Sequence, residues 1–159
     1  MANIQMRGLD EYTRALSRLD LIARDRVCGK AIYEGAGMVA DAVKSAILSV
    51  PTDEAWGTSS DPTSGPQMRQ KQGLYHSLGI TKMRNDNGFL NVKIGFTGYN
   101  EIKTRRWPQG QPNAMVARSI ERGTSFMRAN PFVKKAVSGV KQAVLAAMQR
   151  SIDNSLREL

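Results

Sequence analysis

The chain has 159 residues, of which 41% are hydrophobic, and it carries 23 Lys and Arg against 14 Asp and Glu, for a net charge of +9. These values predict one compact domain over 1–159 and exclude a wholly disordered chain. The positive excess favours contact with nucleic acid or with an acidic protein surface, although the same charge also keeps a globular protein soluble.

The sequence lacks the features of membrane and secreted proteins. No stretch approaches the roughly 18 apolar residues of a membrane span, and the first residues lack the apolar core of a secretory signal. Cys28 is the one cysteine, which excludes an internal disulfide framework. We therefore expect a protein that is made in a cytoplasm and has no membrane contact.

Two amphipathic helices are predicted in the first third of the chain. A short one is indicated by apolar residues at helical spacing, namely Leu9, Tyr12, Leu16 and Leu19. A longer one follows, with an apolar stripe formed by Ile32, Ala36, Val39, Val43 and Ile47. Gly35 and Gly37 lie inside this helix, where it is expected to bend or to pack closely, and Pro51 ends it.

The segment 52–73 is polar, rich in Gly, Ser, Thr and Pro, and has no sustained period. Loops of more than about 12–15 residues are uncommon in compact domains and are usually functional or disordered. We therefore expect one long polar loop here, and expect deletion of 59–70 to spare the fold while weakening assembly. Trp56 is expected to dock on the domain itself, with a neighbouring subunit as the alternative.

An antiparallel hairpin is predicted next. Leu74, His76, Leu78 and Ile80 would share one face of its first strand. The turn is Asn85-Asp86-Asn87-Gly88, a strong hairpin signal. The second strand alternates polar residues with Leu90, Val92, Ile94 and Phe96.

Two more helices complete the chain. Residues 113–122 suit either a helix or a strand, and a short helix is favoured. A long helix is indicated by the apolar positions Val133, Ala136, Val137, Val140, Val144, Ala147, Met148 and Ile152. Asn130 is expected to cap the long helix, with Pro131 at its first position and Phe132 as a buried anchor. The fold class is therefore α+β, a small antiparallel sheet packed against a long N-terminal helix and a C-terminal helix.

Candidate catalytic residues are few. His76 is the single histidine and has no orienting carboxylate near it in the sequence, so we expect a packed or edge side chain. Glu121 is the one acid that could act as a base, but we expect it to pair with arginine or to accept backbone N–H bonds, beside a Gly123 in a left-handed or tight conformation. We expect no enzyme activity, cofactor or metal.

The segment KTRRWPQG is the candidate nucleic-acid contact. Lys103, Arg105 and Arg106 could hold phosphates, and Trp107 could stack on a base. A basic loop of this length is also typical of solvated surface or of an ionic contact with a partner protein.

Five features in order carry a family resemblance: "IQMRGLDEYTRALSRL", the helix that ends at Pro51, "GLYHSLGI", "VKIGF" and "IERGTSFMRANPFVKKAV". Together they resemble the neck or tail-completion proteins of long-tailed bacteriophages. The matching residues of the last feature include Glu121, Gly123, Thr124, Pro131 and Phe132. The polar segment 52–73 stands as an insertion within this pattern.

The resemblance implies a structural virion protein of the phage neck or upper tail, without catalytic activity. Such a protein forms a homo-oligomeric ring of six or twelve subunits around the channel through which DNA passes. It contacts connector or stopper proteins on the head side and tail-tube or terminator proteins on the tail side. A tail-terminator ring subunit, or a small basic nucleic-acid-binding protein, is the alternative.

Overall fold

The computed structural model describes residues 21–159, so the helix predicted around 9–19 lies outside the described residues. In this part of the chain the helices are α2 (Leu21–Ser49), α3 (Met68–Ser77), α4 (Asn113–Arg122) and α5 (Phe132–Arg157). The strands are β1 (Leu78–Ile80), β2 (Arg84–Asp86), β3 (Phe89–Asn91) and β4 (Ile94–Phe96). None of the helices within 21–159 combines the length and apolar character that a bilayer crossing requires.

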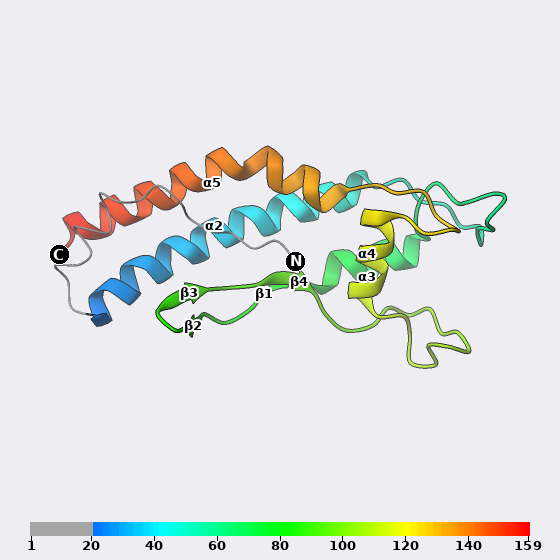
Figure 1. Cartoon of the computed structure of the whole chain (residues 1–159), viewed down its shortest axis with the longest axis horizontal. Coiled ribbons are helices and arrows are strands. Elements are labelled where there is room, and N and C mark those ends of the chain that lie inside the picture. Colours follow the sequence, from blue (N-terminus) through cyan, green and yellow to red (C-terminus); the bar gives the residue numbers. More distant parts are fainter. Residues whose placement is uncertain (1–20) are drawn as a thin grey trace.

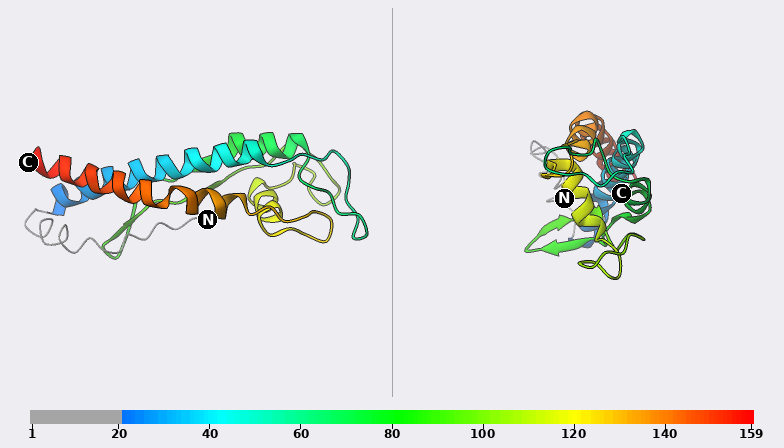
Figure 2. Two further views of the ribbon diagram at one scale, coloured as in Figure 1. Left: turned by 90° about the horizontal axis from the view of Figure 1, so that it is seen from above. Right: turned by 90° about the vertical axis from the view of Figure 1, so that its right-hand side faces the viewer.

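The two long helices, α2 and α5, lie side by side in opposite directions and give the molecule an elongated shape (Figure 1; Figure 2). Their shared core comes from the stripe predicted for α2 and from Val144, Met148 and Ile152 of α5. Gly35 is buried where the helices meet, and a Cβ there would lie 2.7 Å from the Met148 sulfur. The predicted close packing at Gly35 is confirmed.

The carboxyl end of α2 is closed by a basic side chain from α3. The Lys71 ammonium donates to the carbonyl oxygens of Leu48 and Val50, each at 2.8 Å. A positive charge at this end compensates the helix dipole and satisfies carbonyls that have no partner within the helix. The predicted end of the helix before Pro51 is confirmed.

The hairpin is antiparallel, but its strands are interrupted. β1 pairs with β4, and β2 pairs with β3 across a turn at Asn87 (φ 55°) and Gly88 (φ 89°). Between the two ladders the Thr81 hydroxyl accepts from the Lys93 N–H at 2.9 Å, in place of a backbone oxygen. The continuous second strand predicted from Leu90 to Phe96 is therefore wrong in detail, while the hairpin and its turn are confirmed.

The first predicted strand is also wrong over 74–77, which belongs to α3. Gln70 and Leu74 are buried one turn apart on the face of α3 that meets the domain. The Gln70 side chain also accepts the Gln67 N–H at 2.9 Å, which closes the amino end of α3. His76 consequently lies exposed on a helix and not on a strand face.

The polar segment 52–73 is not one long loop, because α3 begins at Met68. The remainder, 52–67, is tied down at several points. The Thr63 N–H donates to the Phe126 carbonyl at 2.8 Å, and the Arg128 N–H donates to the Thr63 carbonyl at 2.9 Å. Gly57 approaches so closely that a Cβ there would collide with the Phe126 carbonyl oxygen. This contact requires glycine.

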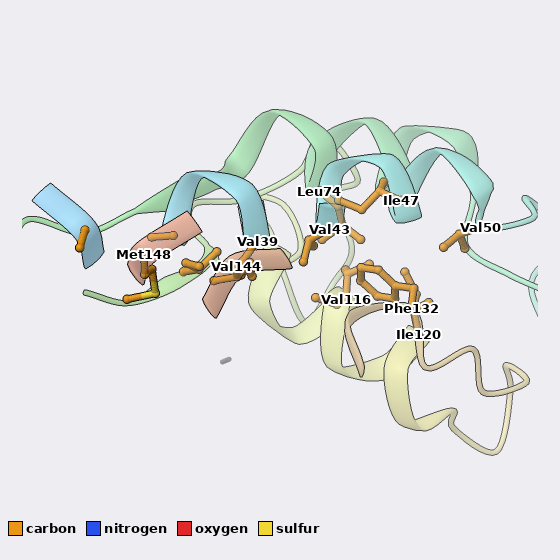
Figure 3. Packing of buried hydrophobic residues seen from close by; sticks show 14 of the residues in the cluster. Val39, Val43, Ile47, Val50, Leu74, Val116, Ile120, Phe132, Val144 and Met148 are labelled. Atoms are coloured by element: carbon orange, nitrogen blue, oxygen red, sulfur yellow. The ribbon is translucent and has the colours of Figure 1, made fainter. Parts of the chain in front are cut away.

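A second part of the core lies where α3 and α4 meet the ends of the long helices (Figure 3). Phe132 is 3% exposed and lies close to Val116 and Ile120 of α4. Its ring is 6.2 Å from that of Phe96, centroid to centroid. The structure is thus an α+β domain whose small antiparallel hairpin packs against α2, as predicted.

Candidate functional site

The residues that carry the family resemblance form a compact corner where α4 ends and α5 begins. The two oxygens of the Glu121 carboxylate accept the N–H groups of Val133 (2.9 Å) and Lys134 (3.0 Å). These are amino-terminal N–H groups of α5, which have no partner inside the helix. Glu121 therefore caps α5 from another helix, which confirms the structural role predicted for it.

Gly123 makes this corner sterically feasible. Its φ of 74° lies in the left-handed region, and a Cβ would stand 2.8 Å from the Ala129 backbone nitrogen. The Gly123 N–H donates to the Ser119 carbonyl at 2.8 Å, which closes the end of α4. The predicted special conformation of Gly123 is confirmed.

Thr124 begins a tight turn after the corner. Its N–H donates to the Met127 carbonyl at 2.9 Å, and its hydroxyl accepts the Phe126 N–H at 3.1 Å. The turn holds Phe126 outward, with 57% of its surface exposed. Thr124 thus fixes the position of an exposed aromatic side chain.

The predicted cap of α5 is wrong in its residue. Pro131 occupies the cap position, and no side chain of that residue bonds the helix. Asn130 contributes its backbone carbonyl, which accepts the Phe132 N–H at 2.7 Å. The Glu121 carboxylate displaces the local Asn cap because it reaches two N–H groups at once and brings a negative charge to the positive end of the helix.

Five exposed cations surround the corner, namely Arg118, Arg122, Arg128, Lys134 and Lys135. Lys134 and Lys135 lie in the first turn of α5, where the helix dipole disfavours a positive charge. The corner therefore presents a positive surface that the one carboxylate of Glu121 does not neutralise.

An apolar hollow of about 310 Å³ lies beside the corner, between 52–67, the start of α3, α4 and the turn 124–127. Met115, Val116 and Met127 contribute to its lining, and Trp56 and Phe126 border it. Trp56 is 69% exposed. The expectation that Trp56 docks on its own domain is therefore wrong, since most of the indole faces solvent.

Two residues that line the hollow, Gln70 and Gln111, belong to a buried polar network. The Gln111 side-chain oxygen accepts from the amides of Gln70 (2.7 Å) and Asn100 (3.1 Å), and the Gln111 N–H donates to the Asn100 side-chain oxygen at 3.0 Å. Buried amides with satisfied partners make this network rigid. Sequence reasoning missed the network, because Gln70 belongs to α3 while Asn100 and Gln111 lie at two points of the loop between β4 and α4, and the three follow no period.

The basic loop after β4 forms a separate feature. Lys103, Arg105 and Arg106 are exposed, whereas Trp107 is half-buried. The Arg106 guanidinium lies 5.5 Å from the centre of the Trp107 ring, and Thr104 and Trp107 exchange backbone hydrogen bonds of 3.0 and 3.1 Å. The cations are thus placed for contact with an anion, while the indole already has a cation as its neighbour.

The remaining candidate groups show no reactive arrangement. His76 lies edge-on to Tyr75, with ring centroids 5.6 Å apart. Burial raises the pKa of the half-buried Cys28 thiol, and Asp25 adds to this while Arg24 opposes it. Within 21–159, no group of three His, Cys, Asp or Glu side chains stands close enough to hold a metal ion.

The structure therefore brings Glu121, Gly123, Thr124 and Phe132 into one corner beside an apolar hollow, and leaves the basic loop apart from them. Comparisons of the chain with protein-family models, with curated proteins and with solved structures gave no match.

Proposed function

We propose that this protein is a structural virion protein of the neck of a long-tailed bacteriophage, where it forms a ring that joins the DNA-filled head to the tail. The observation that carries the proposal is the corner at Glu121. The residues that bear the family resemblance there cap, turn and anchor a helix. These structural roles suit a subunit that must keep a fixed shape in an assembly.

The distribution of exposed apolar side chains supports an assembly role. Trp56 and Phe126 are 69% and 57% exposed at one end of the long axis, and Phe89 is 76% exposed at the tip of the hairpin. Large exposed aromatic residues on rigid supports are typical of surfaces that contact other proteins. A ring subunit needs two such surfaces, because each copy has two neighbours.

In this proposal the protein is part of the virion and is not an enzyme. The ring has six or twelve subunits, with connector or stopper proteins on its head side and tail-tube or terminator proteins on its tail side. Phage DNA passes through its channel. Diffuse positive charge, such as the cations around the corner, suits transient passage of DNA better than a sequence-specific site does.

The test is disruption of the gene in the phage that encodes it. We expect full heads and complete tails that fail to join, and we expect added purified protein to restore joining in an extract. Microscopy of purified particles should place the chain between head and tail. A position at the far end of the tail, or absence from purified particles, would overturn the proposal; a position on the last tail-tube ring would favour a tail terminator.

The second candidate is a small nucleic-acid-binding protein, and the exposed Lys103, Arg105 and Arg106 favour it. A duplex-DNA titration over a salt series separates the two. A dedicated phosphate binder would bind tightly at low salt and lose affinity steeply as salt rises, with a smaller slope in the variant Arg105→Gln/Arg106→Gln. For a ring subunit we expect weak binding that this variant barely changes, with Lys141→Gln/Arg150→Gln as the matched surface control.

A further inference from the structure

We propose that neighbouring subunits contact each other head to tail: the hairpin tip of one copy, centred on Phe89, docks into the apolar hollow bordered by Trp56 and Phe126 of the next copy. The proposal rests on the ring named above and assigns the surfaces that build it. The occupant of the hollow is thus a second copy of this chain.

The hairpin tip carries an exposed apolar side chain, and the hairpin itself is anchored to α2. Phe89 follows the tight turn at Asn87 and Gly88 and is 76% exposed. The hairpin is fixed to α2 midway along its length, because the Met83 N–H donates to the Tyr33 hydroxyl at 2.6 Å and the Met83 methyl lies near Gly29. A support of this kind reduces the entropy lost when the tip is bound.

The hollow offers the complementary shape and chemistry. It is about 310 Å³ and mostly apolar, and its lining includes two exposed aromatic side chains, Trp56 and Phe126. An aromatic side chain buries roughly 150–250 Å² on docking and prefers offset or edge-on contact with other rings. Met115 and Met127 are adaptable side chains that adjust to an inserted ring.

Charge complementarity selects the hairpin as the occupant. Asp53 is the one charged side chain among the residues that line the hollow, and the cations of the corner are not among them. The rest of the segment 52–67 adds Glu54 and Asp61 and no Lys or Arg. The hairpin segment 81–93 carries Lys82, Arg84 and Lys93 against the single acid Asp86. In a chain of net charge +9, the acidic segment and the basic hairpin would attract each other across an interface.

The positions of the two surfaces require contact between copies. The segment 52–67 lies at one end of the long axis, and the hairpin tip lies in the other half of the molecule, alongside α2 (Figure 1; Figure 2). They therefore do not meet within one molecule. A contact between two different patches is heterologous, and it generates a closed ring when the rotation between copies closes.

The solution test uses one variant of each surface. Phe89→Asp removes the tip, and Phe126→Asp places a charge at the mouth of the hollow; both positions are exposed, so both variants should keep the wild-type circular dichroism. By native mass spectrometry we expect the ring to be replaced in each variant by the single 17.5 kDa chain. Leu48→Asp, at another exposed apolar position, should retain the ring.

Mixing the two variants gives the sharper result. Phe89→Asp keeps its hollow and Phe126→Asp keeps its tip, so an equimolar mixture should form a heterodimer and no larger species. An isologous interface, or an occupant other than this chain, predicts no heterodimer. Rings formed by Phe89→Asp alone would overturn the proposal.

The second measurement uses purified particles. It tests the contact even if the protein forms its ring only in the virion. Phe89→Cys combined with Phe126→Cys, in a Cys28→Ser background, should be linked between neighbouring subunits by a short bismaleimide into a ladder. Particles that contain the chain but give no ladder would refute the tip-to-hollow contact and leave the neck function standing. Particles that lack the chain would refute the neck function instead.

Discussion

Glu121 shows how one side chain can set the relation between two helices. It belongs to the last turn of α4, and its carboxylate closes the amino end of α5 through Val133 and Lys134. The arrangement needs Gly123 immediately afterwards, because the chain must turn through a positive φ to bring α5 back to Glu121. Neighbouring residues in the motif thus depend on one another for geometric reasons.

Replacing Glu121 with Ala should lower the free energy of unfolding by about 1–2 kcal/mol, because two helix N–H groups lose a charged acceptor. Urea denaturation measures this loss. Glu101→Ala is the matched control, since Glu101 is exposed in the loop after β4, and it should change stability by less than about 0.5 kcal/mol. Equal stabilities for the two variants would refute the capping role.

Phe132→Ala should cost about 3–5 kcal/mol, because a side chain that is 3% exposed leaves a cavity between α4 and Phe96. Thermal and urea unfolding both report this change. Phe126→Ala is the comparison, since that ring is 57% exposed and its loss should be nearly neutral for the monomer. An unchanged midpoint for Phe132→Ala would contradict its role as an anchor.

Asp53 makes the segment 52–67 sensitive to acid. The N–H groups of Ala55 and Ser64, together with the Ser64 hydroxyl, hydrogen-bond its carboxylate and lower its pKa. A lowered pKa gives stability that is present above the ordinary value of about 3.9 and is lost as pH falls through the folded-state value.

Asp53→Asn should therefore melt below the wild type near neutral pH, and the difference should shrink as pH falls below about 4. Melting curves over a pH series measure it. Asp61→Asn is the control, because at that turn the bond is donated by the Asp61 N–H to Thr58 and does not involve the carboxylate. A difference that grows on acidification would have the wrong sign.

At the scale of elements, the contact between α2 and α5 depends on a small residue at one position. Gly35 faces Met148 and Val144, whereas a Cβ at Gly37 would have nothing within 4 Å. Two glycines in the same helix therefore differ in what they do: one allows close approach, and the other only weakens the helix.

Gly37→Ala should stabilise the protein by about 0.5–1 kcal/mol, because alanine favours the helix and meets no neighbour. Gly35→Ala should be less stable than Gly37→Ala by about 1–3 kcal/mol, since the Met148 side chain must move to admit the methyl group. Chemical denaturation of the two variants side by side tests this. Equal gains would mean that the helices are not closely packed at Gly35.

At the scale of the whole molecule, one end is held together by segments that are distant in sequence. The segment 52–67 pairs with 124–128, and Gln70 of α3 bonds Gln111. Pro66 is fully buried. The loop is therefore part of the structure at this end, and not a solvated insertion.

Deletion of 59–70 should consequently destabilise the fold by about 3 kcal/mol or more, contrary to the expectation from sequence, because it removes buried Thr63, Pro66 and Gln70 together. Loss of cooperative unfolding, followed by circular dichroism, is the readout. If the deletion variant unfolds at the same temperature as the wild type, the loop would be an insertion that the fold does not need, as the sequence predicted.

The sequence by itself determined α2, α5, the hairpin turn and the fold class, and for α4 it favoured a helix over a strand. The stripe from Val39 to Ile47, the apolar positions of α5 and the Asn87-Gly88 turn depend on residues that are close along the chain. Helical periodicity and left-handed turn conformations are local properties, so a single sequence is enough to specify them.

Only the tertiary structure decided the helix over 68–77, the cap of α5 and the hollow. The spacing of Leu74 and Leu78 suits either a strand or a helix, and burial of Gln70 and Leu74 on one helical face settles the choice over that stretch. Asn130 is a sound local cap, but Glu121 accepts the N–H groups of residues 12 and 13 positions further along the chain. Contacts between distant segments carry no period, and they form only when the folded chain brings those segments together.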